Sequence, residues 1–138
     1  LIAEAVQQMW KKNLGIEVSL INQDWKVYLQ SRRQGNFDIA RAAWIGDYPD
    51  PINFLELMTS WSGNNHSGWG DPAYDQLIEK AALEPDPEAR FALLQEAEML
   101  GLQATPFIPI YFYVSAYLVN PSVQGWYPNI LNRHPYHK

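Results

Sequence analysis

The residue best suited to bind a charged ligand is Asp47, which follows the apolar run from Phe37 to Ile45. A run of this length and β-compatible composition predicts an interior strand that is buried on both faces. Open α/β sheets bind ligands beyond the carboxyl ends of their strands, so a carboxylate here could hold a cationic amine. Trp44 and Tyr48 could add aromatic contacts to that cation. The local alternative is a turn residue that hydrogen-bonds its own backbone.

Nearby arginines could bind the opposite charge of a ligand. Arg41 lies within the predicted strand, and the pair Arg32-Arg33 precedes it. A guanidinium group binds a carboxylate through two parallel hydrogen bonds, so these residues could hold a ligand's carboxylate. Burying Arg41 without an acidic partner or a hydrogen-bond network would be costly. The alternatives are a structural ion pair for Arg41 and a solvated helix end for Arg33.

Signals of catalysis are weak. Asp47 and Asp50 could form the carboxylate pair of a hydrolase, but Asp50 stands directly before Pro51 and suits a helix cap. The three histidines form no HExxH pair, and no GxSxG elbow, Walker loop or GxGxxG motif is present. The sequence has no cysteine, which excludes disulfides and thiolate chemistry. We therefore predict no catalytic residues, no metal site and no cofactor.

Length and charge limit the remaining possibilities. The chain has 138 residues, of which 47% are hydrophobic, which is enough for one domain with a buried core. The net charge of −5 and the lack of a basic run argue against a nucleic acid as the main partner. No apolar segment reaches the roughly 18 residues of a membrane span. Because the chain begins within a predicted helix, we expect it to be part of a longer protein.

Helix and strand patterns alternate around the charged residues in the first third of the chain. Apolar residues at helical spacing predict a helix over residues 2–14, and residues 16–20 alternate as in a half-buried strand. Asp24 can cap a helix over residues 25–33, which precedes the strand over residues 37–45. Strand, helix and strand with short links form a βαβ unit. We therefore predict an α/β fold with a sheet core covered by helices.

Three Asp-Pro pairs punctuate the middle of the chain, namely Asp50-Pro51, Asp71-Pro72 and Asp86-Pro87. In each pair the aspartate can cap a helix that begins at the proline. We expect a short helix through about Leu57 and two longer helices that form an antiparallel hairpin over the sheet. The residues predicted to face inward are Tyr74, Leu77, Ile78 and Ala81 on the second helix and Phe91, Leu94, Ala97 and Leu102 on the third.

The remaining segments are a loop, a strand and a tail. Residues 62–70 are polar and glycine-rich, with Trp69 as the expected anchor of the loop. Residues 107–119 are strongly β-prone and predict a strand, and Pro109 indicates an edge or irregular position at its start. The tail after Pro121 is aromatic and proline-rich, so we expect it to pack on another part of the protein.

Four stretches together resemble the periplasmic oligopeptide-binding proteins of ABC peptide importers, which are extracellular solute-binding proteins of family 5. The stretches are WKKNLGIEVSLINQDWKVYL, FDIARAAWIGDYPDPINFL, NNHSGWGDPAYDQLI and PIYFYVSAYLV. The resemblance implies the C-terminal portion of a longer, two-lobed type II periplasmic binding protein. Residues 1–112 would form part of one ligand-binding lobe, and residues 113–138 would return toward the other lobe.

The resemblance also implies roles for single residues. Asp47 matches the carboxylate that holds the peptide's α-amino group, and Ala43 and Ile45 match positions whose backbone pairs with the peptide as an added strand. The residues that match arginines near the ligand's carboxylate are Arg41 and Arg32, and those that match pocket aromatics are Trp25, Trp44 and Tyr113. The sequence departs from the family pattern at Arg33, where histidine is expected, and at Ile45, where a smaller residue is expected. Arg33 adds positive charge near the ligand's C-terminus.

The function implied is capture of an oligopeptide without catalysis and its delivery to membrane permease subunits. The expected location is the periplasm, or the outer face of the cytoplasmic membrane if the longer protein is a lipoprotein. Related receptors for dipeptides, murein peptides, nickel complexes or sugars are the nearest alternatives. Two alternatives from other classes are the hydrolase with a carboxylate pair and a purely structural interaction domain, in which Asp47 would pair with Arg41.

Overall fold

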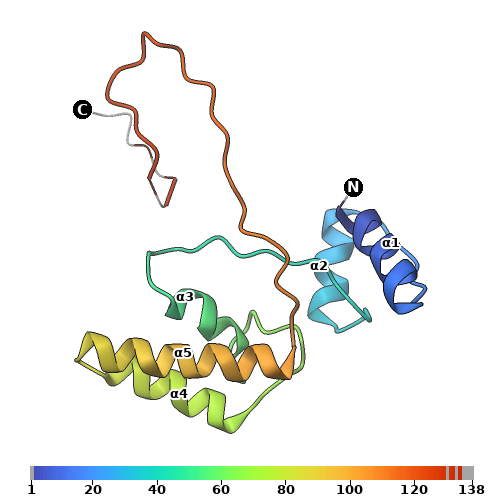
Figure 1. Cartoon of the computed structure of the whole chain (residues 1–138), viewed down its shortest axis with the longest axis horizontal. Helices are drawn as coiled ribbons and strands as arrows, with labels where there is room; N and C mark the ends of the chain where they lie inside the picture. The colour runs from blue at the N-terminus through green and yellow to red at the C-terminus, as the bar shows by residue number, and fades with distance from the viewer. Residues whose placement is uncertain (1, 130, 133, 135–138) are drawn as a thin grey trace. The chain divides into compact units, whose positions relative to one another are not determined.

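The computed structural model describes residues 2–129, 131, 132 and 134, and its regular elements are all helical (Figure 1). These elements are α1 (Ile2–Leu14), α2 (Trp25–Arg33), α3 (Ile52–Leu55), the 3-10 helix η1 (Glu56–Met58), α4 (Pro72–Leu83) and α5 (Pro87–Ala104). The chain divides into two compact units, Leu1–Asp38 and Ile39–Lys138. Within the described part of the chain, no helix combines the length and the hydropathy of a membrane span.

The first unit contains α1 and α2, whose predicted bounds are confirmed. The Asp24 carboxylate accepts a hydrogen bond from the backbone N–H of Lys26 at 3.0 Å and thereby caps α2. The chain after α1 turns back on that helix, because the Gln7 side-chain amide donates to the carbonyl of Val18 at 2.7 Å. Gly15 permits this reversal, since its φ of 68° lies in the left-handed region that favours glycine.

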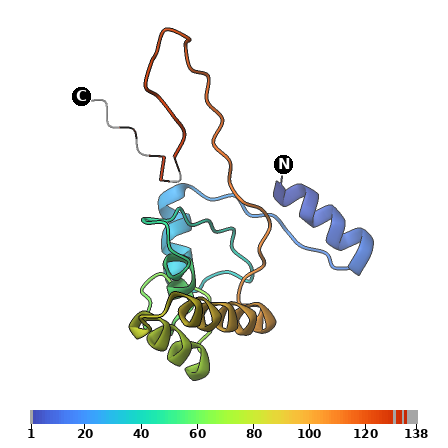
Figure 2. The ribbon, with the colours of Figure 1, turned by 60° about the vertical axis from the view of Figure 1, so that its left-hand side comes forward.

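The second unit is built on the hairpin of α4 and α5, which run antiparallel and side by side in both views (Figures 1 and 2). Each helix begins at the proline of an Asp-Pro pair. The Asp71 carboxylate accepts from the backbone N–H of Ala73 at 2.7 Å, and the Asp86 carboxylate accepts from that of Ala89 at 2.8 Å. The predicted caps at Asp71 and Asp86 and the antiparallel hairpin are therefore confirmed. The first Asp-Pro pair differs, because α3 begins at Ile52 with Pro51 as its N-cap, and no sheet lies under the hairpin within the described residues.

The core of the second unit lies where α3 and η1 meet the hairpin. Its buried residues are Leu55, Met58, Tyr74, Ile78, Ala81, Leu94 and Ala97, and Leu77 and Trp69 pack against them. Tyr74 is fully buried, and its hydroxyl donates to the carbonyl of Leu55 at 2.7 Å. A side chain at Gly101 would lie 3.1 Å from Met58, so glycine lets α5 approach closely here. The predicted inward face of α4 and the anchoring role of Trp69 are confirmed.

The predicted inward face of α5 is wrong at two positions. Phe91 is 54% exposed and Leu102 is 39% exposed, whereas Leu94, Ala97 and Gly101 are buried. At about 100° per residue, Phe91 and Leu102 lie roughly 60° and 80° around the helix from Leu94, on the side away from Ala97. The buried stripe is therefore narrower than apolar residue type alone predicted, and small residues form much of it.

The predicted strands over residues 16–20, 37–45 and 107–119 do not form, and no strand occurs in the ranges that the structure describes. A strand is stable only when its backbone groups pair with a neighbouring strand, and none of these segments pairs with another strand in the described part of the chain. Residues 16–20 bond to α1 instead, through the Ile16 N–H to the Trp10 carbonyl at 3.3 Å and through the Val18 carbonyl to the Gln7 amide. The βαβ core of the predicted α/β fold is therefore absent from this structure. The predicted segment 113–138 ends outside the described residues, and its role as a separate part stays a prediction.

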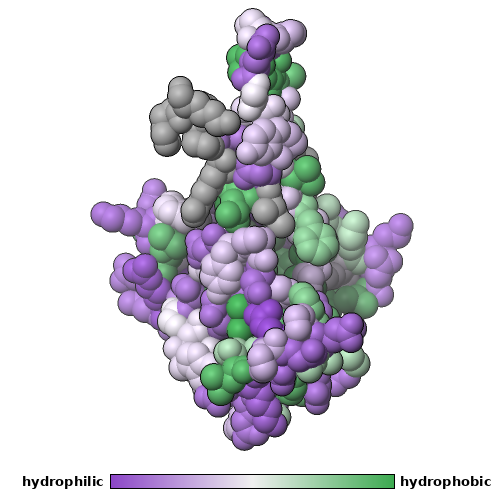
Figure 3. All heavy atoms as spheres, turned by 90° about the vertical axis from the view of Figure 1, so that its left-hand side faces the viewer, coloured by the Kyte–Doolittle hydropathy of each residue, from purple (hydrophilic) through white to green (hydrophobic). Residues whose placement is uncertain are grey.

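The unpaired segments leave large apolar side chains uncovered. Ile45 is 80% exposed, Phe112 is 96% exposed and Val114 is 82% exposed. Figure 3 shows apolar side chains, in green, at the surface of the face that it displays. Soluble domains seldom expose contiguous apolar surface of this kind unless it contacts something else. These segments therefore have the composition of buried strands without the burial.

Candidate functional site

Residues 44–47, called here the Trp44–Asp47 turn, form an irregular segment that bends at Asp47 and is held by one buried amide. The side-chain oxygen of Asn53 on α3 accepts a hydrogen bond from the Trp44 indole N–H at 2.9 Å. The same oxygen accepts a second bond from the backbone N–H of Asp47 at 3.0 Å. Asn53 is only 2% exposed, so both bonds are shielded from water at the acceptor. The turn is therefore tied to α3 at both of its ends.

Gly46 brings the backbone of this turn into direct contact with α3. A Cβ atom at this position would lie 3.1 Å from the ring of Phe54 and 3.5 Å from the Asn53 oxygen. Real Cβ atoms rarely approach other atoms as closely as the first of these distances. The lack of a side chain at Gly46 therefore allows the Asn53 amide to reach both hydrogen-bond donors.

The start of α3 is held in turn by an ion pair to α5. The Asp50 carboxylate accepts from the backbone N–H of Ile52 at 2.9 Å and from the Arg90 guanidinium at 2.8 Å. The hydrogen bond from Arg90 is the main cause that lowers the pKa of Asp50, and the same bond raises the pKa of Arg90. Asp50 is thus an ionised carboxylate that bonds the first N–H group of α3, one residue before the N-cap Pro51. A general acid needs a raised pKa instead, which counts against the hydrolase with a carboxylate pair.

The ion pair of Asp50 and Arg90 should make the free energy of unfolding depend on pH. The pKa of Asp50 is lower in the folded state, so its contribution to stability is full above the unfolded-state pKa. That contribution disappears as the pH falls through the folded-state pKa. Arg90→Gln is expected to lower the free energy of unfolding by about 1 kcal/mol at neutral pH. The difference between variant and parent chain should shrink below a pH of about 4.

Urea unfolding at several pH values measures this difference. Lys11→Gln is the matched control, because Lys11 pairs with Glu17 at the surface. The exposed fractions of these two side chains are 62% and 77%. Its cost is expected to be under about 0.5 kcal/mol at every pH. A cost of Arg90→Gln that is the same at neutral and acidic pH would contradict the stabilising role of the ion pair.

The Asp47 side chain is exposed, and its carboxylate makes no hydrogen bond or ion pair with the described residues. The local alternative, in which this side chain bonds its own backbone, therefore does not occur. If the chain were a purely structural interaction domain, Asp47 would be expected to pair with Arg41. This pair is not formed among the described residues. The carboxylate remains open to a ligand from outside the chain.

The other predicted site residues are distributed over both units. Ala43 and Ile45 are exposed beside Trp44, and Tyr113 is 75% exposed. Three others, Trp25, Arg32 and Arg33, lie on α2 of the first unit. There Trp25 stacks on Tyr28 with ring centroids 5.5 Å apart, and the Arg32 guanidinium lies 5.7 Å from the centre of the same ring. Residues 43–47 therefore lie together in the second unit. That the α2 residues contribute to the same ligand site stays a prediction.

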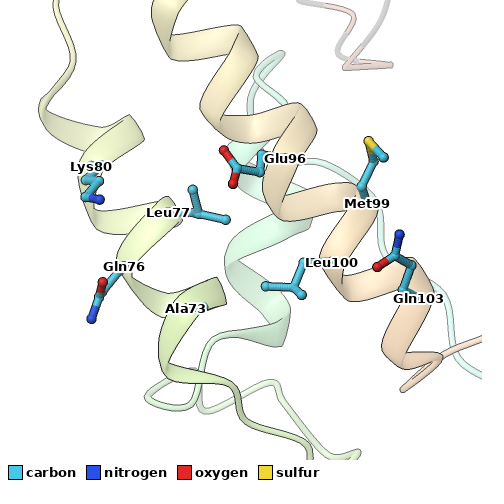
Figure 4. Close-up of a pocket in the computed structure, with 8 residues that line it drawn as sticks. All are labelled: Ala73, Gln76, Leu77, Lys80, Glu96, Met99, Leu100 and Gln103. Atoms are coloured by element: carbon cyan, nitrogen blue, oxygen red, sulfur yellow. The ribbon is translucent and has the colours of Figure 1, made fainter.

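An open groove lies between α4 and α5 of the second unit (Figure 4). Leu77 and Leu100 point into the space between the two helices, and Lys80 and Glu96 lie along its rim. None of the predicted site residues lines this groove. It is the outer seam of the hairpin, and it brings no cluster of ionisable groups together. Within the described residues, no three histidine or acidic side chains gather as a metal site would require.

Two residues that support the site were missed by the sequence analysis. Asn53 is a polar residue in the apolar run from Ile52 to Leu55, and a polar residue amid buried ones usually has specific hydrogen-bond partners. That signal was available in the sequence. Arg90 gave no signal, because it stands 40 residues from Asp50 in an ordinary exposed-helix context.

Comparison with known proteins agrees with the resemblance of the sequence. The family model described as bacterial extracellular solute-binding proteins, family 5 Middle, matches residues 1–66. The chain is 46% identical over 125 residues to the periplasmic murein peptide-binding protein MppA of Escherichia coli strain K12, covering 91% of this chain and 23% of that protein. It is 42% identical over 125 residues to the oligopeptide-binding protein OppA of Bacillus subtilis strain 168, covering 90% of this chain and 23% of that protein.

Solved structures match the chain as well. The crystal structure of Haemophilus influenzae OppA in complex with the peptide RPPGFSPFR superposes with a TM-score of 0.83 at 37% identity. The match covers 90% of this chain and 25% of that one. The chain thus spans about a quarter of the length of these proteins.

Proposed function

Because the chain belongs to the bacterial extracellular solute-binding proteins of family 5, we propose that it is part of a receptor that captures oligopeptides for uptake by an ABC transporter. In this proposal the Asp47 carboxylate holds the α-amino group of the peptide. The observation that carries the proposal is the exposed Asp47 carboxylate, which bonds none of the described residues and follows a segment whose backbone pairs with no other strand among them. A carboxylate and an ammonium group form a charge-assisted hydrogen bond, which is among the stronger ones in proteins.

The backbone before Asp47 supports binding of the peptide main chain. The peptide groups of Ala43 and Ile45 make no backbone–backbone hydrogen bonds with the described residues, so their donors and acceptors are open. An extended peptide can pair with such groups as an added strand. Backbone pairing uses the main-chain N–H and C=O groups that all peptides share. The side chains of the peptide would occupy surrounding pockets. Such a receptor would therefore accept many peptide sequences.

The remaining predicted residues complete the proposed site. Arg41, Arg32 and Arg33 would meet the ligand's C-terminal carboxylate, depending on the length of the peptide. The aromatic residues Trp25, Trp44 and Tyr113 would surround its side-chain pockets. Two lobes would close around the extended peptide, in the periplasm or at the outer face of the cytoplasmic membrane, and deliver it to membrane permease subunits.

The proposed receptor also requires the α/β lobe that the sequence predicted. Residues 16–20, 37–45 and 107–119 would then pair in a sheet with each other or with other parts of the longer protein. Their uncovered apolar side chains support this, because pairing in a sheet would bury them. A murein peptide is a second candidate ligand, since MppA is among the most similar relatives and its name states that it binds murein peptide. Receptors for dipeptides, nickel complexes or sugars remain the broader alternatives within the family.

Mass spectrometry of ligands that co-purify with the full-length protein tests the proposed function. The expected result is a mixture of peptides that share a free α-amino group and differ in their side chains. Protein that has been unfolded, washed and refolded provides the control, since it should carry no such peptides before they are added again. A nickel complex, a sugar or a single cross-linked murein fragment as the sole ligand would contradict oligopeptide capture.

A further inference from the structure

Asn53 is the buried polar side chain that bonds the backbone of Asp47. Its single oxygen accepts from the Trp44 indole at 2.9 Å and from the Asp47 backbone at 3.0 Å. We propose that Asn53 is a positioning residue, which fixes the direction of the Asp47 carboxylate and so sets the affinity for the α-amino group of a peptide. This inference rests on the proposed function of Asp47. Asn53 itself is buried and acts through the turn rather than by touching the ligand.

The hydrogen bond to the backbone of Asp47 determines where its carboxylate can lie. The carboxylate is joined to the Cα atom by only two rotatable bonds, so fixing the main chain restricts it to a few rotamers. A ligand then loses less conformational freedom when it binds, because the protein group is already ordered. Asn53 thus bonds the main chain of Asp47, and the Asp47 carboxylate bonds none of the residues that the structure describes.

Asn53 can serve this purpose because its own position does not depend on a ligand. It lies on α3, whose first N–H group, that of Ile52, bonds the Asp50 carboxylate. Asp50 is paired in turn with Arg90 on α5 at 2.8 Å. Leu55, two residues later, is buried in the core. Phe54 packs closely on Gly46 from the same helix. The hairpin thus supports α3, and α3 supports the turn that carries Asp47.

The proposed role of residue 53 requires a side chain with a hydrogen-bond acceptor. Two N–H groups, one from an indole and one from the main chain, converge on a buried acceptor. Leucine has a similar volume but no acceptor, so both donors would lose their buried partner. Aspartate keeps an oxygen in nearly the same place. The pair Asn53→Leu and Asn53→Asp therefore separates the acceptor from the volume of the side chain.

The test uses calorimetry on the full-length protein with a tripeptide and its N-acetylated form, which lacks the cationic amine. Asn53→Leu is expected to weaken binding of the free tripeptide by about tenfold and that of the acetylated form by less than about threefold. Asn53→Asp should stay within about threefold of the parent protein for both ligands. In an Asp47→Asn background, Asn53→Leu should weaken binding little further, because both substitutions act on the same interaction, that of the Asp47 carboxylate with the α-amino group.

The outcomes separate this inference from the proposed function. Unchanged affinity after Asp47→Asn alone would overturn the proposed role of Asp47. If Asp47→Asn weakens binding, but Asn53→Leu has no effect or weakens both ligands equally, only the positioning role of Asn53 is overturned. Should Asn53→Leu fail to fold, Asn53→Ala removes the acceptor without adding a large apolar group and is measured against the same two ligands.

Discussion

Replacing Asp47 by asparagine in the full-length protein is expected to weaken binding of tripeptides and tetrapeptides by at least ~1.5 kcal/mol, which is about tenfold in the dissociation constant. Asparagine has nearly the same shape as aspartate, so the loss reports the charge rather than the volume. The expected loss follows from the exposed carboxylate, which bonds no residue in the described part of the chain and would give up a charge-assisted hydrogen bond to the peptide's ammonium group.

Calorimetry with a free and an N-acetylated peptide measures this effect. The acetylated peptide should bind the parent protein weakly and should lose little more on Asp47→Asn. Glu79→Gln on α4 is the matched control, because Glu79 is also an exposed carboxylate without a partner among the described residues. It changes the net charge equally but should leave both affinities unchanged. An unaltered dissociation constant in the Asp47→Asn variant would remove this residue from the site.

Replacing Tyr74 by alanine is expected to produce the largest loss of stability, about 3–5 kcal/mol. Tyr74 on α4 is fully buried in the core that α3, η1 and the hairpin form. Its ring packs edge-on against Trp69 with centroids 5.1 Å apart. Alanine would leave a cavity at the centre of the core of this unit. Because α3 carries Asn53 and rests on this core, the same change should also loosen the Trp44–Asp47 turn.

Tyr74→Phe separates the two contributions of this side chain. Phenylalanine keeps the ring but loses the bond from the hydroxyl to the Leu55 carbonyl, which should cost about 1 kcal/mol. Burial raises the pKa of the Tyr74 hydroxyl, so it stays a neutral donor and this cost should not change between pH 5 and pH 9, a window well below the unshifted pKa of about 10. Urea unfolding followed by circular dichroism measures both variants.

Leu83→Ala provides the control for the core, because Leu83 is 84% exposed at the end of α4. Its expected cost lies within about 0.5 kcal/mol. Equal losses from Tyr74→Ala and Leu83→Ala would contradict the assignment of the core to the region around Tyr74.

The helical hairpin and the candidate site are linked by side chains that are distant in sequence. Arg90 on α5 pairs with Asp50, Asp50 bonds the N–H of Ile52 at the start of α3, and Asn53 on α3 holds the turn that carries Asp47. Each step is one hydrogen bond of 2.8–3.0 Å. A rigid support of this kind is what a binding group needs if its direction is to be set before the ligand arrives.

The sequence by itself determined the features that depend on local interactions. The bounds of α1 and α2, the caps at Asp24, Asp71 and Asp86, and the inward face of α4 follow from helical periodicity and from carboxylates near free backbone N–H groups. The family also follows from the sequence, through four stretches of residues. Asp47 was singled out in the same way, from its place after an apolar run, although its role as a ligand group remains a proposal.

Only the tertiary structure decided the features that depend on residues far apart in the chain. The β-prone segments form no strands here, because a strand takes its stability from a partner that no local pattern can supply. Phe91 proved exposed because the hairpin contact, rather than residue type, selects the buried stripe of α5. The two bonds that converge on Asn53 and the Asp50–Arg90 pair likewise appear only after folding, since both join groups that the chain brings together through packing.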